Sequence, residues 1–437
     1  MSHKRWDQLV GSLRRTLAAL PDRRTGDNAR YSMEDIGLSA FAVFFTQSPS
    51  FLSAQNTLRK NKGRSNAQSL FQIAQIPCDN HIRQSLDPVP PDQLFPLYDE
   101  VYQALRQTGL LESFRSVHQT HLIALDGTWC QSSQKIHCDQ CSCLEHKSGD
   151  KTYYHSALTP VIVAPGQPEA IPLRPEFITP QDGHTKQDCE IAAAKRWLQK
   201  NGATYSPLKA TLLGDDLYSH QPFCRCTLLN NFHFIFVCKP DSHTTLYNWV
   251  NLLQAPHLRT LKTHAKVGAH FHTYTYRYAN AVPLAEGQDA LRVNWCELTE
   301  TDPEGKVLYL NSWVTDFQIT DQNVSAIAAA GRARWKIENE NNNTLKTKGY
   351  HLEHNFGHGK KQLASLLTAL NILAFLYHTF LAFTDENYRL IRATLPTRQT
   401  FFDDLRALTR YILFPNWDAL LDFMLRGLEI GPYTKPT

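Results

Sequence analysis

Three groups of acidic residues stand where they could hold a divalent metal ion. Asp126 ends the apolar run THLIALDG, Asp215 and Asp216 end the run LKATLLGDD, and Glu338 lies in RARWKIENENNNTLK. Acids at the carboxyl ends of buried strands lie where α/β sheets place their ligands, although Asp-Gly and Asp-Asp also make turns. Divalent cations prefer oxygen ligands, and a pair of them can activate the attacking oxygen and stabilise the leaving one in phosphoryl transfer. Two strand-end aspartates and a helix glutamate fit that chemistry.

The elements that would position these acids follow from the hydrophobic pattern. Residues 1–115 are predicted to be helical, because apolar residues recur at helical spacing in WDQLVGSLRRTLAAL and QLFPLYDEVYQALRQTGLL. From about residue 118, strands alternate with helices, which predicts an α/β core with at least some parallel strands. Residues 243–315 alternate in the manner of strands with no long helix between them, which predicts an antiparallel β insertion.

Composition sets limits on the class of protein. The chain has 437 residues, 42% hydrophobic and 20% charged, as in ordinary globular proteins of two or three domains. A net charge of +4 excludes binding of nucleic acid through global charge, but not through local basic patches. No apolar signal segment opens the sequence, so the ten cysteines are expected to be reduced and any cysteine cluster to bind metal. Polar residues interrupt the uncharged stretch 362–384, which favours a buried core helix over a membrane span.

Three motifs resemble those of the DDE transposases of bacterial insertion sequences, over roughly residues 118–385. LIALDGTW resembles the strand with the first aspartate, LLGDDLYS the strand with the second, and RWKIE the third motif. In the second motif an aromatic residue follows the aspartate by three positions. Tyr218 therefore favours Asp215 over Asp216.

The third motif is matched in part. Its pattern in the family is Tyr, then Arg three residues on, Glu four further and Lys seven further. Arg334 and Glu338 match it. The Tyr position holds Gly331, and the Lys position holds Leu345, with Lys346 one residue later.

Helical geometry separates the two glutamates of this stretch. At about 100° per residue, Arg334 lies about 40° and Lys346 about 80° from Glu338 around the helix axis, within reach of one site. Glu340 lies about 160° from Glu338 and is expected to face away. Trp335 is expected to pack the helix onto the sheet, and the three asparagines to contact phosphate or line a DNA groove.

The resemblance implies a DNA transposase. Asp126, Asp215 and Glu338 would be catalytic and hold Mg²⁺ or Mn²⁺, while Arg334 and Lys346 would contact DNA. The enzyme would cut element ends by phosphodiester hydrolysis and join the 3′-hydroxyl to target DNA. The implied partner is double-stranded DNA, held by a homodimer on paired ends, with no membrane, in the bacterial cytoplasm at the nucleoid. The alternatives are a ribonuclease H-like nuclease without strand joining and an inactive DNA-binding zinc protein.

The implied fold is α/β, with a ribonuclease H-like mixed sheet, flanking helices, an inserted antiparallel β subdomain and an N-terminal helical domain. The expected divisions are an N-terminal helical domain at 1–115 that binds DNA, the first part of the catalytic core at 116–242, the inserted β subdomain at 243–316, the remainder of the core at 317–385 and a helical tail at 386–437.

The resemblance also gives Trp313 a role. In this family a Trp on the last strand before the Glu helix stacks on a displaced base, and Trp313 in YLNSWVTDF has that order and spacing. The alternative is a core Trp on an alternating strand.

A cysteine-rich loop predicts a structural zinc site at 137–155. HCDQCSCLEH contains the C-x-x-C pair Cys138 and Cys141, and structural zinc takes four N or S ligands. Cys143, His146 or His155 would complete the site, and we take Cys143 and His155 as its expected members. Free thiols in a surface loop are the alternative. The later stretch HLEHNFGHGKK is read as a connector whose His and Lys residues contact DNA phosphate.

Overall fold

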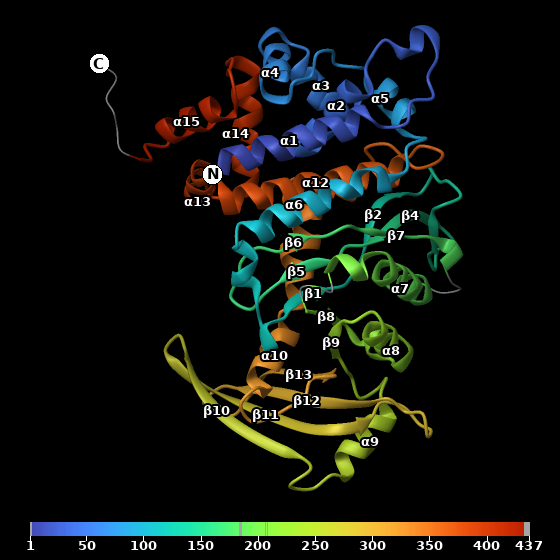
Figure 1. Cartoon of the computed structure of the whole chain (residues 1–437), viewed down its shortest axis with the longest axis vertical. Helices are drawn as coiled ribbons and strands as arrows, with labels where there is room; N and C mark the ends of the chain where they lie inside the picture. Colours follow the sequence, from blue (N-terminus) through green and yellow to red (C-terminus); the bar gives the residue numbers. More distant parts are fainter. Residues whose placement is uncertain (1, 183–185, 206, 208, 432–437) are drawn as a thin grey trace.

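A nine-stranded mixed sheet forms the centre of the computed structural model, which describes residues 2–182, 186–205, 207 and 209–431. Its order is β10-β11-β12-β13-β9-β8-β1-β5-β6 (Figure 1). The strands are β1 (His121–Ala124), β5 (Val161–Val163), β6 (Ile171–Pro172), β8 (Ala210–Gly214), β9 (His233–Val237), β10 (Arg259–Val267), β11 (His270–Pro283), β12 (Arg292–Thr301) and β13 (Val307–Thr315). β1, β8 and β9 run parallel, while β5 runs antiparallel to β1. This mixed arrangement is compatible with the ribonuclease H-like fold that the sequence predicts.

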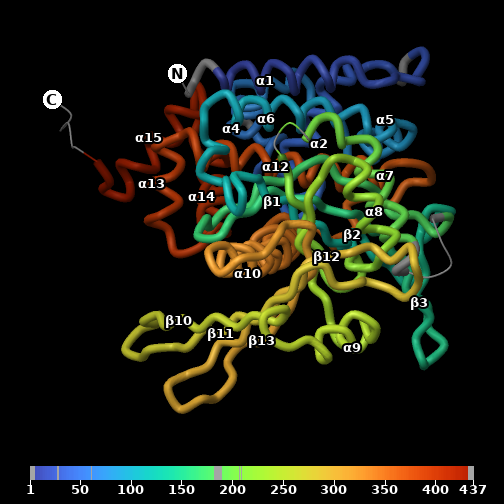
Figure 2. The backbone as a smooth tube through the Cα atoms, turned by 60° about the horizontal axis from the view of Figure 1, so that its bottom comes forward, coloured from blue at the N-terminus to red at the C-terminus, as the bar shows by residue number. Residues whose placement is uncertain are grey.

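The predicted β insertion continues the same sheet. β10 to β13 form an antiparallel meander, and β13 pairs with β9 through the Trp313–Val237 register. Helix α9 (Thr244–Leu252) packs on β11. The hairpin of β10 and β11 reaches away from the body of the molecule (Figure 2). The insertion is therefore joined to the core by backbone hydrogen bonds.

A second, smaller sheet begins immediately after Asp126. It contains β2 (Gly127–Ser133), β3 (Ser142–Glu145), β4 (Lys151–Leu158) and β7 (Glu176–Ile178). β2 and β4 are antiparallel neighbours, and β4 leads directly into β5 of the main sheet. The cysteine-rich loop therefore connects β2, which starts directly after the first aspartate, to β3.

Helices from both ends of the chain form a helical layer beyond the β6 edge of the main sheet, where α12 (Leu363–Thr384) contacts β6 (Figure 1). The N-terminal members are α1 (Ser2–Ala18), α2 (Met33–Phe45), α3 (Phe51–Leu58), α4 (Asn61–Phe71), α5 (Asp79–Leu86) and α6 (Phe95–Gln107). The C-terminal members are α12 (Leu363–Thr384), α13 (Glu386–Thr394), α14 (Arg398–Tyr411) and α15 (Trp417–Gly427). Asn66 ties the two groups together, because its Nδ2 donates to the carbonyl oxygens of Thr409 and Ile412 at 2.6 and 2.7 Å.

Helix α12 is the core of this layer. It packs against α2 and α6, and every residue from Leu363 to Leu381 is buried. In the part of the chain that the structure describes, it is the one helix long and apolar enough to cross a membrane, and 89% of its most apolar stretch is buried inside the molecule. The helix is packed as the buried core helix that the sequence predicts.

Candidate active site and cysteine–histidine cluster

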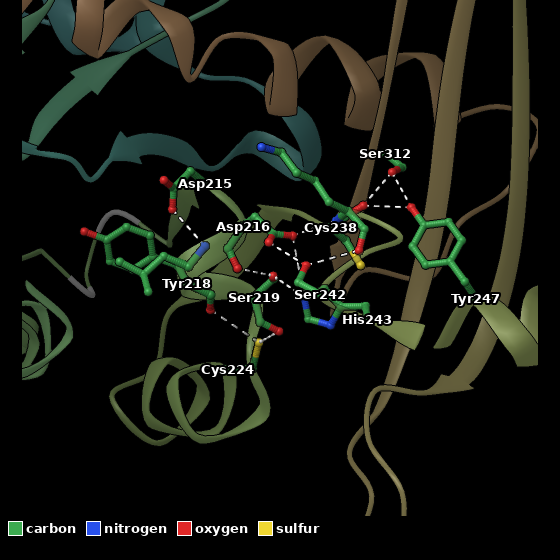
Figure 3. Close-up of polar contacts among 12 residues, drawn as sticks. Asp215, Asp216, Tyr218, Ser219, Cys224, Cys238, Ser242, His243, Tyr247 and Ser312 are labelled. Atoms are coloured by element: carbon green, nitrogen blue, oxygen red, sulfur yellow. Dashed lines mark hydrogen bonds and ion pairs between the residues drawn. The ribbon is translucent and has the colours of Figure 1, made fainter. Parts of the chain in front are cut away.

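Asp126 and Asp215 lie at one edge of the main sheet because β1 and β8 are parallel neighbours. Ala124 pairs with Leu213, and each aspartate follows its member of that pair by two residues. Asp215 also caps the short 3-10 helix η7 (Asp216–Ser219). The backbone N–H of Leu217 donates to Asp215 Oδ1 at 2.9 Å (Figure 3). The topology therefore brings the two predicted aspartates together.

The second acid of the Asp-Asp pair has a structural role. Asp216 accepts hydrogen bonds from the backbone N–H of Lys239 at 2.6 Å and from the hydroxyl of Ser242 at 2.5 Å (Figure 3). These bonds fix the loop that follows β9. Asp215 is thus the acid that shares the sheet edge with Asp126, in keeping with the preference from the sequence.

Glu338 stands on a π-helical segment instead of a regular α-helix. Helix α10 (Val324–Arg332) is followed by the π-helical segment η8 (Ile337–Asn342) and then by α11 (Asn343–Thr347). A π-helix bonds residue i to i+5, so a uniform rotation of about 100° per residue does not hold across this segment. The Glu338 side chain is 50% exposed and pairs with Arg334 at 2.7 Å.

Asn342, at the end of the π-helical segment, contacts the first aspartate. Its Nδ2 donates to Asp126 Oδ2 at 2.7 Å, and its Oδ1 accepts from the Thr159 hydroxyl and from Asn341 Nδ2, each at 2.9 Å. Asn341 and Asn342 are buried, so the expectation that they contact DNA is wrong. Asn342 instead ties the Glu338 segment to Asp126.

Burial and like charge meet at Asp126. Its pKa is raised to about 7, first by burial and then by the Glu190 carboxylate, with further contributions from Glu338 and Asp215. The Arg334 guanidinium opposes this rise and also lowers the pKa of Asp215, which burial raises. The acids and Arg334 therefore form one electrostatic cluster, and a cation bound among the acids would relieve their repulsion.

Glu190 belongs to this cluster, and the sequence reasoning missed it. It lies on α7 (Lys186–Tyr205), is buried, and accepts a hydrogen bond from the Tyr218 hydroxyl at 2.7 Å. A Cβ added to Gly127 would lie 2.5 Å from Glu190 Oε2, so the carboxylate rests against the residue that follows Asp126. Asp126 is therefore followed by glycine because a side chain at position 127 would collide with the Glu190 carboxylate. No local sequence pattern marks Glu190, because its partner Tyr218 lies 28 residues away in the chain.

Trp313 lies in the core beneath α10. It is fully buried, and a Cβ added to Gly331 would lie 2.6 Å from its indole Nε1. In this structure Trp313 therefore has the environment of a core Trp, the alternative given above, and its stacking on a displaced base stays a prediction. The same contact explains why position 331 holds glycine and not the tyrosine of the third motif, because no side chain fits between α10 and the indole.

Lys346 and Trp335 also lie differently from expectation. Lys346, expected to contact DNA, forms an ion pair with Glu353 at 2.9 Å. Trp335, expected to pack onto the sheet, is 40% exposed, and Lys336 Nζ lies 4.9 Å from the centre of its ring. The exposed aromatic residue next to Arg334 is therefore Trp335.

Four metal-ligand side chains converge in a separate group, which we call the Cys2His2 group. Its members are Cys138, Cys141, His155 and His358. In the described part of the chain, it is the one group of at least three His, Cys, Asp or Glu residues whose ligand atoms all lie within 4.8 Å of one another. The carboxylates around Asp126 are not gathered that closely. Burial lowers the pKa of His155 to about 4, which keeps this imidazole in the neutral form that binds metal.

The membership of the Cys2His2 group corrects the predicted ligand set. Cys143 lies on β3, is exposed and does not belong to the group. His358 takes the fourth position, with its Nε2 3.2 Å from Cys141 Sγ. His358 therefore faces the cysteine loop in this structure, whereas the sequence predicts that it contacts phosphate. The sequence pairs Cys138 with Cys141 correctly because they lie in one loop, whereas His358 arrives from a distant segment.

Comparisons with known proteins add one resemblance. No protein-family model matches the chain, and no curated protein matches its sequence. Among solved structures, the chain is similar to the piggyBac transposase synaptic complex with hairpin DNA, at 10% sequence identity and a TM-score of 0.38. The match covers 99% of this chain and 84% of that chain. A similarity of this size carries no argument about function, which has to come from the site itself.

The Trp313–Gly331 contact predicts a steric penalty for any side chain at position 331. Gly331→Ala should lower the free energy of unfolding by about 1–3 kcal/mol, because the new methyl group overpacks a fully buried indole. Gly427→Ala is the matched control, since nothing lies within 4 Å of a Cβ at this helical position and the variant should be neutral or more stable by up to about 1 kcal/mol. Urea unfolding measures both variants, and equal stability would contradict the contact.

The raised pKa of Asp126 predicts a pH-dependent loss of stability in the metal-free protein. Its folded-state value of about 7 lies above the ordinary value of about 3.9, so the folded state binds this proton more tightly. The contribution to stability is therefore fully present below about pH 4 and is lost as the pH rises to about 7. Asp126→Asn removes that loss, so the variant should gain up to about 4 kcal/mol over wild type between pH 4 and pH 8. The free energy of unfolding of both proteins is measured by urea unfolding in EDTA across this pH range. If it changes with pH in the same way for wild type and for Asp126→Asn, the raised pKa of Asp126 is refuted.

Proposed function

We propose that this chain is a DNA transposase of the DDE type, encoded by a bacterial insertion sequence. The observation that carries the proposal is the meeting of three chain segments at one sheet edge: Asp126 and Asp215 follow neighbouring parallel strands, and the Asn342–Asp126 hydrogen bond brings in the segment of Glu338. The proposed activity is phosphodiester hydrolysis at element ends, followed by joining of the 3′-hydroxyl to target DNA.

The donor set fits hard divalent cations. Asp126, Asp215 and Glu338 supply carboxylate oxygens. The pKa of Asp126 is raised first by burial and then by neighbouring carboxylates, and a bound cation would offset that like-charge repulsion. When bound, Mg²⁺ or Mn²⁺ would supply charge stabilisation at the attacking and leaving oxygens. Asn342 orients Asp126 through its amide, and Arg334 offers a planar guanidinium that suits a phosphate.

The proposed partner is double-stranded DNA, as element ends and as target, bound by a homodimer in the bacterial cytoplasm at the nucleoid. Trp335 and Arg332 support a DNA-facing surface beside the site, since both are partly exposed just before the segment that carries Glu338, although Arg332 also pairs with Glu300. An exposed Trp can stack on an unpaired base, and an exposed Arg can contact phosphate. For the Cys2His2 group we propose a structural Zn²⁺, because two thiolates and two imidazoles are ligands that zinc prefers.

Alanine variants of the proposed ligands test the assignment. Asp126→Ala and Glu338→Ala should each slow Mg²⁺-dependent cleavage of plasmid DNA carrying the element's ends by about 1,000-fold or more. The reason is that metal-mediated stabilisation is worth several kcal/mol, and each 1.36 kcal/mol is tenfold in rate. DNA binding, measured by gel shift, should persist in both variants.

Glu340→Ala is the matched control. Glu340 lies in the same π-helical segment but lines a pocket with Glu169 and Arg398, to which Asp126, Asp215 and Glu338 do not contribute. This variant should cleave like wild type. Unchanged cleavage in the Asp126 and Glu338 variants would overturn the site assignment. Cleavage by wild type without strand joining would identify the nuclease, and binding without cleavage would identify a DNA-binding zinc protein.

A further inference from the structure

The distances within the Cys2His2 group match a tetrahedral zinc site. Zinc–sulfur bonds of about 2.3 Å and zinc–nitrogen bonds of about 2.0–2.1 Å place the ligands about 3.8 Å apart for two sulfurs and about 3.5 Å for sulfur and nitrogen. Cys138 Sγ lies 3.9 Å from Cys141 Sγ and 3.6 Å from His155 Nε2. Cys141 Sγ lies 3.5 Å from His155 Nε2 and 3.2 Å from His358 Nε2.

The four ligands come from segments that flank the candidate active site. Cys138 and Cys141 lie between β2 and β3, and His155 lies on β4 opposite Cys130 of β2. Of these strands, β2 starts directly after Asp126. His358 lies 217 residues after Cys141, in the connector between α11 and α12. We call residues 348–362 the connector, and it begins just beyond the Glu338 segment.

The connector contains no helix or strand, so individual side-chain and backbone hydrogen bonds to other elements position it. The Arg83 side chain donates to the Phe356 carbonyl oxygen at 2.9 Å, and the backbone N–H of Lys361 donates to Asp87 Oδ1 at 3.0 Å. On the side of the small sheet, the backbone N–H of Gln131 donates to Leu352 O at 3.3 Å. His358 is the member of the connector that reaches the cysteine loop.

We infer that the Cys2His2 group is a zinc clasp, in which one Zn²⁺ fastens the connector to the small sheet. It thereby fixes the two chain segments that lead away from Asp126 and from Glu338. All four positions are filled by protein ligands, so the ion is structural and has no open site for a substrate. The inference rests on the geometry of the Cys2His2 group and does not depend on the DNA chemistry proposed above.

Metal analysis of the purified full chain tests the ligand set. The wild type should hold one zinc per chain. His358→Ala should weaken zinc binding by more than the 10–100-fold typical of losing an outer partner of a ligand, whereas Cys143→Ser should leave it unchanged. His358→Cys supplies a thiolate at the same position and should restore the bound zinc if the alanine variant folds poorly. Full zinc binding by His358→Ala, or loss of zinc in Cys143→Ser, would overturn the set.

Hydrogen–deuterium exchange tests the clasp itself. Removal of zinc by a chelator should increase backbone exchange in the connector and in β2, while exchange in α12 stays unchanged because the helical layer packs independently of the ion. Unchanged exchange in the connector would overturn the clasp even if zinc binds. Neither measurement uses DNA cleavage, so failure of the transposase proposal and failure of the clasp are distinguishable.

Discussion

The parallel pairing of β1 with β8 is the constraint on which the candidate site depends. Parallel neighbours end at the same edge of a sheet, so the register of Ala124 with Leu213 brings Asp126 and Asp215 to the same edge. The hydrogen bonds of the sheet thus hold together two groups that repel each other when ionised. The pKa of Asp126 is raised first by burial and then by the Glu190 carboxylate, and Asp215 adds a smaller contribution.

This constraint is the part of the site that was accessible from the sequence. An apolar run ended by an acid is a local pattern, and two such runs in an alternating α/β chain predict one shared edge. The buried helix α12 and the pairing of Cys138 with Cys141 were accessible for the same reason, since each depends on residues close together in the chain. In all three cases, local pattern and tertiary structure agree.

The remaining features depend on contacts between distant segments. The π-helical winding of η8 moves Asn342 away from where uniform α-helical rotation would place it, and no residue type signals that change. Glu190 is an ordinary helix residue until Tyr218 and Gly127 meet it. Trp313 was expected to be exposed to DNA and is buried, whereas Trp335 was expected to be buried and is exposed. Whether a single Trp is buried depends on the helix that packs over it, which the local sequence does not show.

The two glycines of the motifs show why a family pattern and a fold need not agree residue by residue. Gly127 leaves room for the Glu190 carboxylate, and Gly331 leaves room for the Trp313 indole. Neither has a left-handed backbone, so neither is explained by a turn. Each allows an element to approach the sheet closely: α7 at Asp126, and α10 just before Glu338. A tyrosine at 331 would push α10 outward and carry Glu338 away from the sheet edge. In this chain, glycine at position 331 is therefore compatible with the packing of α10 on the Trp313 indole, and a tyrosine is not.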